Sequence, residues 1–311
     1  METIRFNDFD VHYYDDCTSF FHINLSDTSD FYNALFDYFF DEQRLLSYIE
    51  NKKQLKFNLT KCNFVSLYKH LQLYIDQHNE EIDYNLFNDE ILKVLQDEYN
   101  LEDKGEGKFK VRLDKMGKIG ELIFSNILFE YFKFDCIIPK CHLTTDRNMN
   151  VYGIDTLYYS ENNNMILFGE SKLSKSLENG IKLIKESLKD YESNIKEEFI
   201  LVLSNRLYRD KFGKFGEKFN EVIEECINIE QFIELAEIKQ IGVPIFIAHG
   251  EDNIISNIFD QLKKIQKNKL LGLDTMYFLI SLPILNKSKL IATFTKRIRE
   301  KREFYERSSV K

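Results

Sequence analysis

Tryptophan is absent from the 311-residue sequence, prolines number only three, and no long apolar run is present. A membrane-spanning helix needs about 20 apolar residues in succession, and an export signal needs a basic start followed by an apolar stretch. Neither pattern occurs in this chain. We therefore predict a cytoplasmic protein that does not enter a membrane.

Cysteines are also few. The five present are scattered and lack the C-x-x-C spacing of zinc and redox motifs. Cys136, Cys141 and His142 form the one cluster, which is one ligand short of the four that a structural zinc site uses. We interpret the cysteines as small buried or loop residues in a reducing compartment, and keep zinc at this cluster as an alternative.

The chain lacks the excess of basic residues that a free-standing DNA-binding protein shows. Its formal net charge is −9, and the acidic residues are concentrated near the start. Residues 1–100 carry 19 acidic and 8 basic side chains, whereas residues 101–311 carry 32 and 34. A charged, glycine-punctuated stretch at residues 102–108 separates the two parts. We predict an acidic accessory or partner-docking region at residues 1–105 and a main domain at residues 106–311.

The most informative segment is a pair of strand-like runs at residues 150–159 and 165–172, joined by a polar turn. If Ser160 pairs with Met165, Asp155 lies directly opposite Glu170. Carboxylates in that relation are about 5 Å apart at Cβ and destabilise a sheet, so a divalent cation is the simplest compensation. Alternation along the second strand puts Lys172 on the same face as Glu170.

The elements around this hairpin follow a regular order. Apolar spacing predicts helices at residues 114–132 and 177–195, and short apolar runs predict strands at residues 136–139 and 198–204. The order from residue 114 to residue 204 is then α-β-β-β-α-β. Further strands are expected near residues 243–248 and 276–285, and a basic helix is expected at the end.

This order and its residues resemble a known superfamily. The helical segment KIGE at residues 118–121, the strand GID at 153–155 and the strand GESK at 169–172 look like PD-(D/E)xK nucleases. Ile154 replaces the proline of that signature. Residues 117–188 in particular resemble the HamA family, the nuclease subunits of the Hachiman anti-phage defence system of bacteria.

The resemblance implies a fold, a site and a partner. The fold would be α/β, with a restriction-endonuclease-like core in which helices flank a mixed sheet. Asp155, Glu170 and Glu121 would bind Mg²⁺, with Mn²⁺ as a substitute, and Lys172 would orient the attacking water or stabilise phosphate charge. The substrate would be DNA cut with little sequence preference, and the partner would be the superfamily 2 helicase HamB.

Two groups of basic residues are candidates for phosphate contacts. Lys175, Lys182, Lys185 and Lys189 fall near one face of the helix that follows the Glu170 strand. The last 25 residues, from Lys287, carry nine basic and three acidic side chains. The alternative for both groups is a solvated helix face.

Other functions remain open at this point. A stand-alone restriction or repair endonuclease would use the same fold, and fold alone does not separate it from a defence nuclease. A catalytically silent scaffold that binds DNA or a partner belongs to a different class. Asp155, Glu170 and Lys172 would then be a structural salt-bridged patch and Glu121 a surface residue. The residues do not exclude RNA as the substrate.

Overall fold

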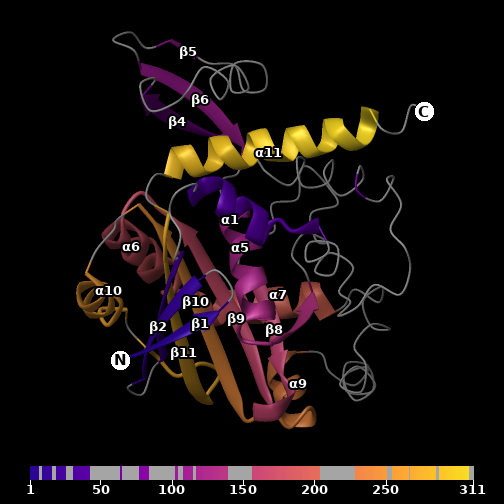
Figure 1. Ribbon diagram of the computed structural model, residues 1–311. Coiled ribbons are helices and arrows are strands. Elements are labelled where there is room, and N and C mark those ends of the chain that lie inside the picture. The colour runs from indigo at the N-terminus through magenta and orange to yellow at the C-terminus, as the bar shows by residue number, and fades with distance from the viewer. Residues whose placement is uncertain are drawn as a thin grey trace.

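The fold is a sheet between two helical layers, with a small second sheet above them (Figure 1). The computed structural model describes residues 1–6, 9–15, 19–25, 31–42, 64, 77–83, 102–103, 108–114, 117–138, 156–203, 228–250, 254–265, 267–284 and 287–307.

The main sheet has eight strands in the order β1-β2-β3-β11-β10-β9-β8-β7. Strands β3, β11, β10 and β9 run parallel, and antiparallel strands extend the sheet on both sides. The predicted α/β fold with a mixed sheet flanked by helices is therefore confirmed. The strands are β1 Glu2–Phe6, β2 Phe9–Asp15, β3 Ser19–Leu25, β7 Asp135–Ile138, β8 Thr156–Ser160, β9 Met165–Leu173, β10 Gln240–His249 and β11 Asp274–Pro283.

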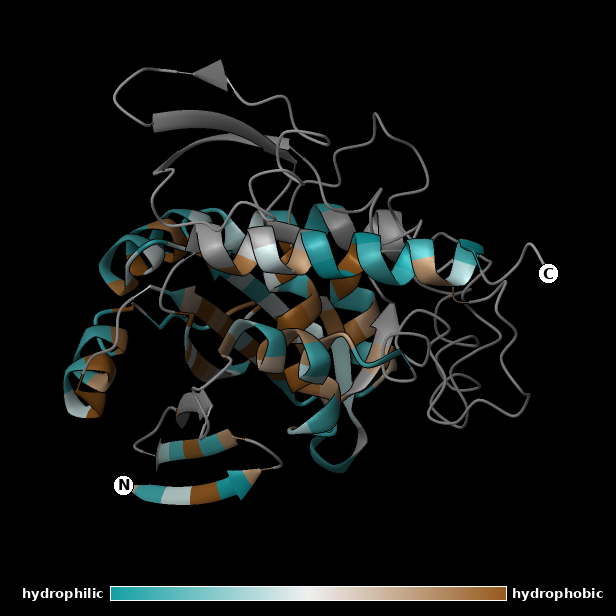
Figure 2. Cartoon of the chain, turned by 45° about the horizontal axis from the view of Figure 1, so that its top comes forward, coloured by the Kyte–Doolittle hydropathy of each residue, from teal (hydrophilic) through white to brown (hydrophobic). Residues whose placement is uncertain are grey.

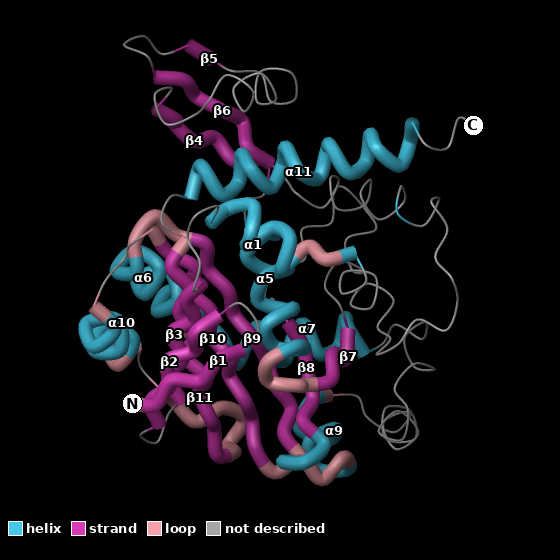
Figure 3. Tube along the Cα trace, in the orientation of Figure 1, coloured by secondary structure: helices cyan, strands magenta, loops and turns pink. Residues whose placement is uncertain are grey.

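Helices cover both faces of this sheet (Figure 3). One core holds the apolar side chains of α1 (Phe31–Phe39), α5 (Gly117–Glu130) and α11 (Lys287–Arg307). The other core holds those of α6 (Leu177–Ser187), α7 (Tyr191–Leu203), α9 (Ile229–Leu235) and α10 (Ile255–Leu262). Side chains of β9 point alternately into the two cores, so that Leu167 belongs to the first and Phe168 to the second.

The hairpin of β8 and β9 has the predicted register. Ser160 pairs with Met165, and the pairing continues to Thr156 opposite Gly169. A short 3₁₀ turn, Glu161–Asn163, closes the hairpin, and Asn164 takes a left-handed conformation with φ of 45°. The Asn164 side chain joins the turn to its surroundings by accepting a hydrogen bond from the Tyr159 hydroxyl, 2.7 Å away, and donating one to the Glu237 carbonyl.

The strand predicted at residues 198–204 is wrong. Residues 198–203 form the end of helix α7, and the helix predicted over residues 177–195 is divided between α6 and α7. A short apolar run has no period that separates a buried strand from a buried helix, which explains the error. The strand that follows these helices and pairs in parallel with β9 is β10. The predicted α-β-β-β-α-β order therefore holds with β10, rather than residues 198–204, as its last strand, and with more than one helix before it.

The start of the chain contributes to the main sheet. Strand β3 pairs in parallel with β11 near the other end of the sequence, and α1 packs against α11. A second sheet, of order β4-β6-β5, lies above α11 in Figure 1. Its strands are β4 Gln77–Asp83, β5 Glu102–Asp103 and β6 Lys108–Asp114, so it includes part of the predicted connector. Much of residues 1–105 lies outside the described residues, and the domain boundary stays a prediction.

In the described part of the chain, every helix is either too short or too polar to cross a bilayer. The longest, α11, is mostly hydrophilic over the half that leads to the C-terminus, as the teal colour in Figure 2 shows.

Candidate active site

Glu170 and Lys172 lie together near the end of β9. The ammonium of Lys172 donates a hydrogen bond to the Glu170 carboxylate. The Glu170 side chain is only 5% exposed, whereas that of Lys172 is 25% exposed. The carboxylate is therefore withdrawn from water while the ammonium reaches the surface, so that solvent and ligands approach the pair from the lysine side.

The environment of the pair on this face is apolar. Ile245 pairs with Glu170 across the sheet, and Ile247 pairs with Lys172; both isoleucines are fully buried in the core that α6 covers. A carboxylate in such surroundings is costly unless charged or polar partners compensate it. The ion pair with Lys172 provides one such compensation.

Helix α6 begins directly after this site because its first turn is capped. Ser176 accepts a hydrogen bond from the amide of Asn179 at 3.2 Å, and the Asn179 side chain donates to the Ser174 hydroxyl at 2.9 Å. Gly180 then faces Ile247 so closely that a Cβ on Gly180 would lie 2.5 Å from the isoleucine Cγ2. The missing side chain therefore sets how closely α6 approaches β10.

Glu121 lies on α5 and is 9% exposed. Its neighbour Gly120 faces Leu173, since a Cβ on Gly120 would lie 3.4 Å from the Leu173 Cβ. Helix α5 therefore approaches β9 closely at Gly120. Leu173 belongs to the core of α1, α5 and α11, and alternation directs Glu170 and Lys172 to the opposite face of β9. The structure thus brings Glu170 and Lys172 together and sets Glu121 on the helix that covers the other face.

Asp155 lies outside the described residues. The last described pair of the hairpin is Thr156 with Gly169. Asp155 comes directly before Thr156 and Glu170 directly after Gly169. The described register is therefore the one on which the prediction of Asp155 opposite Glu170 depends. Within the described ranges, which do not include Asp155, no three His, Cys, Asp or Glu side chains form a metal-binding group. Cys136 is buried, and its zinc-site companions Cys141 and His142 also lie outside the described residues.

The Glu170 carboxylate is a donor of the kind that a hard divalent cation such as Mg²⁺ or Mn²⁺ prefers, and its side chain is almost fully buried. Glu121 offers a second buried carboxylate, but on the other side of the sheet. On α5, the buried hydroxyl oxygen of Ser125 has no hydrogen-bond partner within the described structure. An orphaned oxygen of this kind is compatible with a bound water or ion that completes its hydrogen bonding.

The sequence did not single out a buried polar pair at the ends of β10 and β11. Nε2 of His249 lies 2.8 Å from the Ser281 hydroxyl, and neither residue is exposed. The signal was Ser281 itself, which interrupts the apolar run of its strand. Because the pair is closed to solvent, we interpret it as a satisfied polar contact inside the core.

The lysines after β9 are at the surface. Lys175, Lys182, Lys185 and Lys189 are all exposed, on α6 or directly beside it. Lys189 forms an ion pair of 2.7 Å with Glu186. The group is therefore accessible to a phosphate backbone, with Lys182 and Lys185 in the helix itself.

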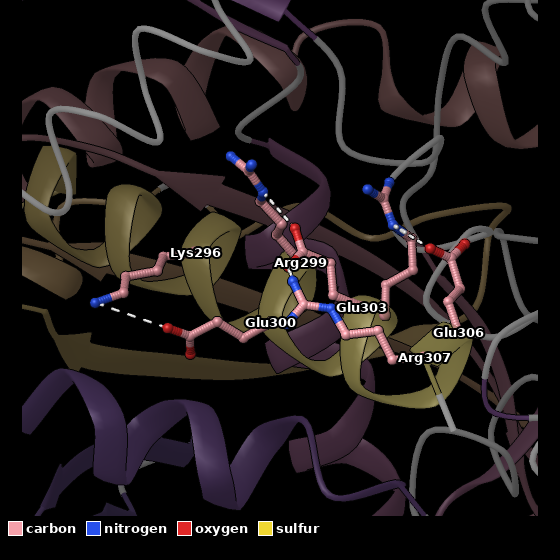
Figure 4. A network of polar contacts seen from close by, with 7 residues as sticks. Lys296, Arg299, Glu300, Glu303, Glu306 and Arg307 are labelled. Carbon is pink, nitrogen blue, oxygen red and sulfur yellow. Dashed lines mark hydrogen bonds and ion pairs between the residues drawn. The ribbon is translucent and has the colours of Figure 1, made fainter. Parts of the chain in front are cut away.

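The basic residues of α11 are largely neutralised by acidic ones. Figure 4 shows the row along the helix, in which Lys296 pairs with Glu300, Arg299 and Arg307 with Glu303, and Arg302 with Glu306. Two further basic residues reach the N-terminal part of the chain, where Arg297 pairs with Asp37 and Lys301 with Glu42. These contacts favour a structural role for the terminal helix over phosphate binding.

Comparison with known proteins identifies the family of the chain. None of the curated proteins and none of the solved structures matches the chain significantly. The family model HamA matches residues 3–298 of the 311, which include the strands of the main sheet, apart from Glu2, and the first half of α11. The chain therefore belongs to the HamA family of the Hachiman anti-phage defence system.

Proposed function

We propose that this HamA-family protein is a metal-dependent deoxyribonuclease that hydrolyses phosphodiester bonds with little sequence preference. The observation that supports this most directly is the ion pair of Glu170 and Lys172 near the end of β9. A buried carboxylate next to a partly exposed ammonium, on a strand paired with a hairpin of the required register, is the arrangement that the nuclease signature needs.

Each residue has a proposed role. The Glu170 carboxylate would hold Mg²⁺ or Mn²⁺ together with Asp155. The role of Glu121 in binding a second cation stays a prediction, because the helix that carries it covers the opposite face of β9. When bound, the cation would polarise the scissile phosphate and lower the pKa of a coordinated water. An ammonium bound to a carboxylate is a charged donor rather than a free base, so Lys172 orients the water or stabilises charge on the phosphate.

The family suggests the partner, and the distribution of charge on the chain fits the proposed substrate. The exposed lysines Lys175, Lys182, Lys185 and Lys189 offer contacts to a phosphate backbone that carry no sequence information. The net charge of −9 opposes binding of DNA by the chain alone. We infer that a partner, the superfamily 2 helicase HamB, delivers the DNA and controls the nuclease, and that residues 1–105 take part in docking.

Cleavage of supercoiled plasmid tests the activity. Wild-type protein, with and without the helicase, is incubated with Mg²⁺, with Mn²⁺ and with EDTA. We expect nicking with either cation and none with EDTA. Asp155→Ala and Lys172→Met should abolish it, whereas Lys269→Met should not, because Lys269 is an exposed lysine paired with Asp274.

The outcomes separate the alternatives. Unchanged cleavage by Asp155→Ala would remove the assigned site. Absence of cleavage under every condition, helicase included, would favour a silent scaffold. Cutting at one defined sequence without the helicase would favour a restriction endonuclease. Adding single-stranded RNA as a competitor shows whether the protein prefers RNA or DNA, because a preferred RNA would reduce plasmid cleavage.

Docking needs a test other than truncation. Deleting residues 1–105 would remove β1, β2 and β3 from the main sheet and would disturb the fold. Charge reversal at Glu2, which is exposed on β1, changes one surface side chain and removes no strand. We expect weaker binding of the helicase, measured by calorimetry, and wild-type affinity in this variant would count against docking at the exposed edge strand β1.

A further inference from the structure

The Glu170 carboxylate is in contact with a cation that belongs to the chain itself, the ammonium of Lys172. Nζ of Lys172 contacts Oε1 of Glu170, and the Glu170 side chain is almost fully buried. Ile245 and Ile247, the residues of β10 that pair with Glu170 and Lys172, are 0% exposed. A carboxylate in such surroundings is costly without a positive partner, and the ammonium provides one.

A metal ion on Glu170 would compete with this ammonium. Two cations on one carboxylate lie only a few Å apart, and like charges repel each other more strongly in a protein interior than in water. The charges also balance in either state. Glu170 and Lys172 together are neutral. In the proposed function Glu170 and Asp155 share a divalent ion, and those three charges cancel too, so that a retained ammonium would leave an excess positive charge in the site.

The Lys172 side chain is able to leave the carboxylate. It is 25% exposed, so the ammonium already lies near solvent. The four methylene groups of a lysine can stay on an apolar surface while the ammonium extends to water. Ile247, the partner of Lys172 across the sheet, belongs to such a surface. Withdrawal of the ammonium therefore moves it to the side from which solvent and ligands approach.

We propose that the ammonium of Lys172 takes the place of the metal ion on Glu170 in the metal-free protein, and that it moves towards the substrate side when a divalent cation binds. The inference rests on the proposed nuclease function and concerns the regulation of the same site. Lys172 is engaged in the ion pair until the cation is bound and becomes available to a phosphate group afterwards. Cation binding then comes before the contact of Lys172 with the substrate.

Mn²⁺ binding without DNA tests the competition. The electron paramagnetic resonance signal of the free ion gives the half-saturating Mn²⁺ concentration. Lys172→Met removes the ammonium and keeps an apolar side chain of similar length. It should lower that concentration about tenfold or more, because a charge in contact changes the proton affinity of a carboxylate by about 10- to 1,000-fold and should act on a metal ion in the same way. A lysine that orients only the attacking water would leave Mn²⁺ binding unchanged.

Lys175→Met is the matched control for net charge. Lys175 is exposed and lies three positions further along the chain. Because solvent screens an exposed charge, this variant should change Mn²⁺ binding less than about twofold. Glu170→Gln should weaken Mn²⁺ binding, since it removes the charged ligand. Equal effects of the two lysine variants would assign the change to net charge and would overturn the inference, as would unchanged or weaker Mn²⁺ binding in Lys172→Met.

Chemical labelling follows the lysine in the wild-type protein and needs no substitution. Acetic anhydride acetylates accessible lysines, and mass spectrometry measures the extent at Lys172 relative to Lys175. Mg²⁺ should raise this ratio above its value in EDTA, because the displaced ammonium reaches water. A ratio that Mg²⁺ leaves unchanged, in protein that binds Mn²⁺ and cleaves DNA, would overturn the inference and leave the proposed function standing. Wild-type protein that neither binds Mn²⁺ nor cleaves DNA would overturn both.

Discussion

The ammonium of Lys172 is bound to the carboxylate of Glu170, two positions earlier on β9. Both side chains leave the strand on the face that α6 covers, but they differ in exposure, at 25% and 5%. Removing the Lys172 ammonium would leave the negative charge of Glu170 in the core without this ion pair, whereas removing the Glu170 carboxylate would leave an ammonium that can turn to solvent. This asymmetry makes the pair accessible to mutation experiments.

Substitution of either partner should destabilise the protein to a different extent. Lys172→Met leaves the Glu170 carboxylate buried without its ammonium and should cost about 3 kcal/mol of unfolding free energy in EDTA. Glu170→Gln should cost less, because the lysine stem can extend to water. Urea unfolding of both variants and of the double variant measures this order. The double variant should be more stable than Lys172→Met alone, and equal losses in the two single variants would contradict the asymmetry.

The lysines of α6 should determine the salt dependence of DNA binding. Lys182→Ala and Lys185→Ala each remove an exposed basic side chain. If each contacts a phosphate, the slope of log K against log salt should fall by about one per substitution, for any DNA sequence. Fluorescence anisotropy over a salt series, with the helicase present if it is needed for binding, measures the slope. Lys296→Ala is the control, since Lys296 already pairs with Glu300. An unchanged slope in both α6 variants would assign these lysines to a solvated face.

Gly180 should tolerate no side chain. A Cβ there would lie 2.5 Å from the Ile247 Cγ2, so Gly180→Ala should cost about 1–3 kcal/mol of unfolding free energy through overpacking, despite the better helix propensity of alanine. Gly120→Ala is the matched control on α5, where the nearest atom is the Leu173 Cβ at 3.4 Å. Chemical denaturation should show near-wild-type stability for the control. Adding Ile247→Ala to Gly180→Ala should give a loss smaller than the sum of the single losses, and full additivity would argue against the clash.

The hydrogen bond between Tyr305 of α11 and Glu42 should be lost at high pH. Burial and the hydrogen bond to the Glu42 carboxylate raise the pKa of Tyr305 to about 12. The protonated hydroxyl is the donor, and its pKa is about 10 in the unfolded chain, so the stability it adds is complete below pH 10 and is lost as the pH rises towards 12. Subtracting the 295 nm titration of Tyr305→Phe from that of the wild type should leave a component with a midpoint near 12. A midpoint near 10 would show that the contact does not form, and Glu42→Gln should move the midpoint down.

The local sequence pattern was sufficient to predict those elements that have a clear hydrophobic period or a well-defined turn. The hairpin register was predicted because a polar turn of defined length leaves one arrangement that keeps apolar residues facing the cores, and the described pairs confirm it. The helix that carries Glu121 was also predicted. The strand expected at residues 198–204 was wrong, because a short apolar run fits a buried helix as well as a buried strand.

The sequence by itself determined the α/β class, the hairpin, and the presence of Glu170 and Lys172 on one face of a strand, since these follow from the alternation of side chains along the chain. Only the tertiary structure decided that β10 is the parallel neighbour of β9 and that β3 pairs with β11. It also decided that basic residues of α11 form ion pairs with acidic residues of the same chain. It also placed the helix of Glu121 on the opposite face of β9 from Glu170 and Lys172. These relations join residues far apart in sequence, and they depend on which surfaces bury the most apolar area together, a property that no local pattern carries.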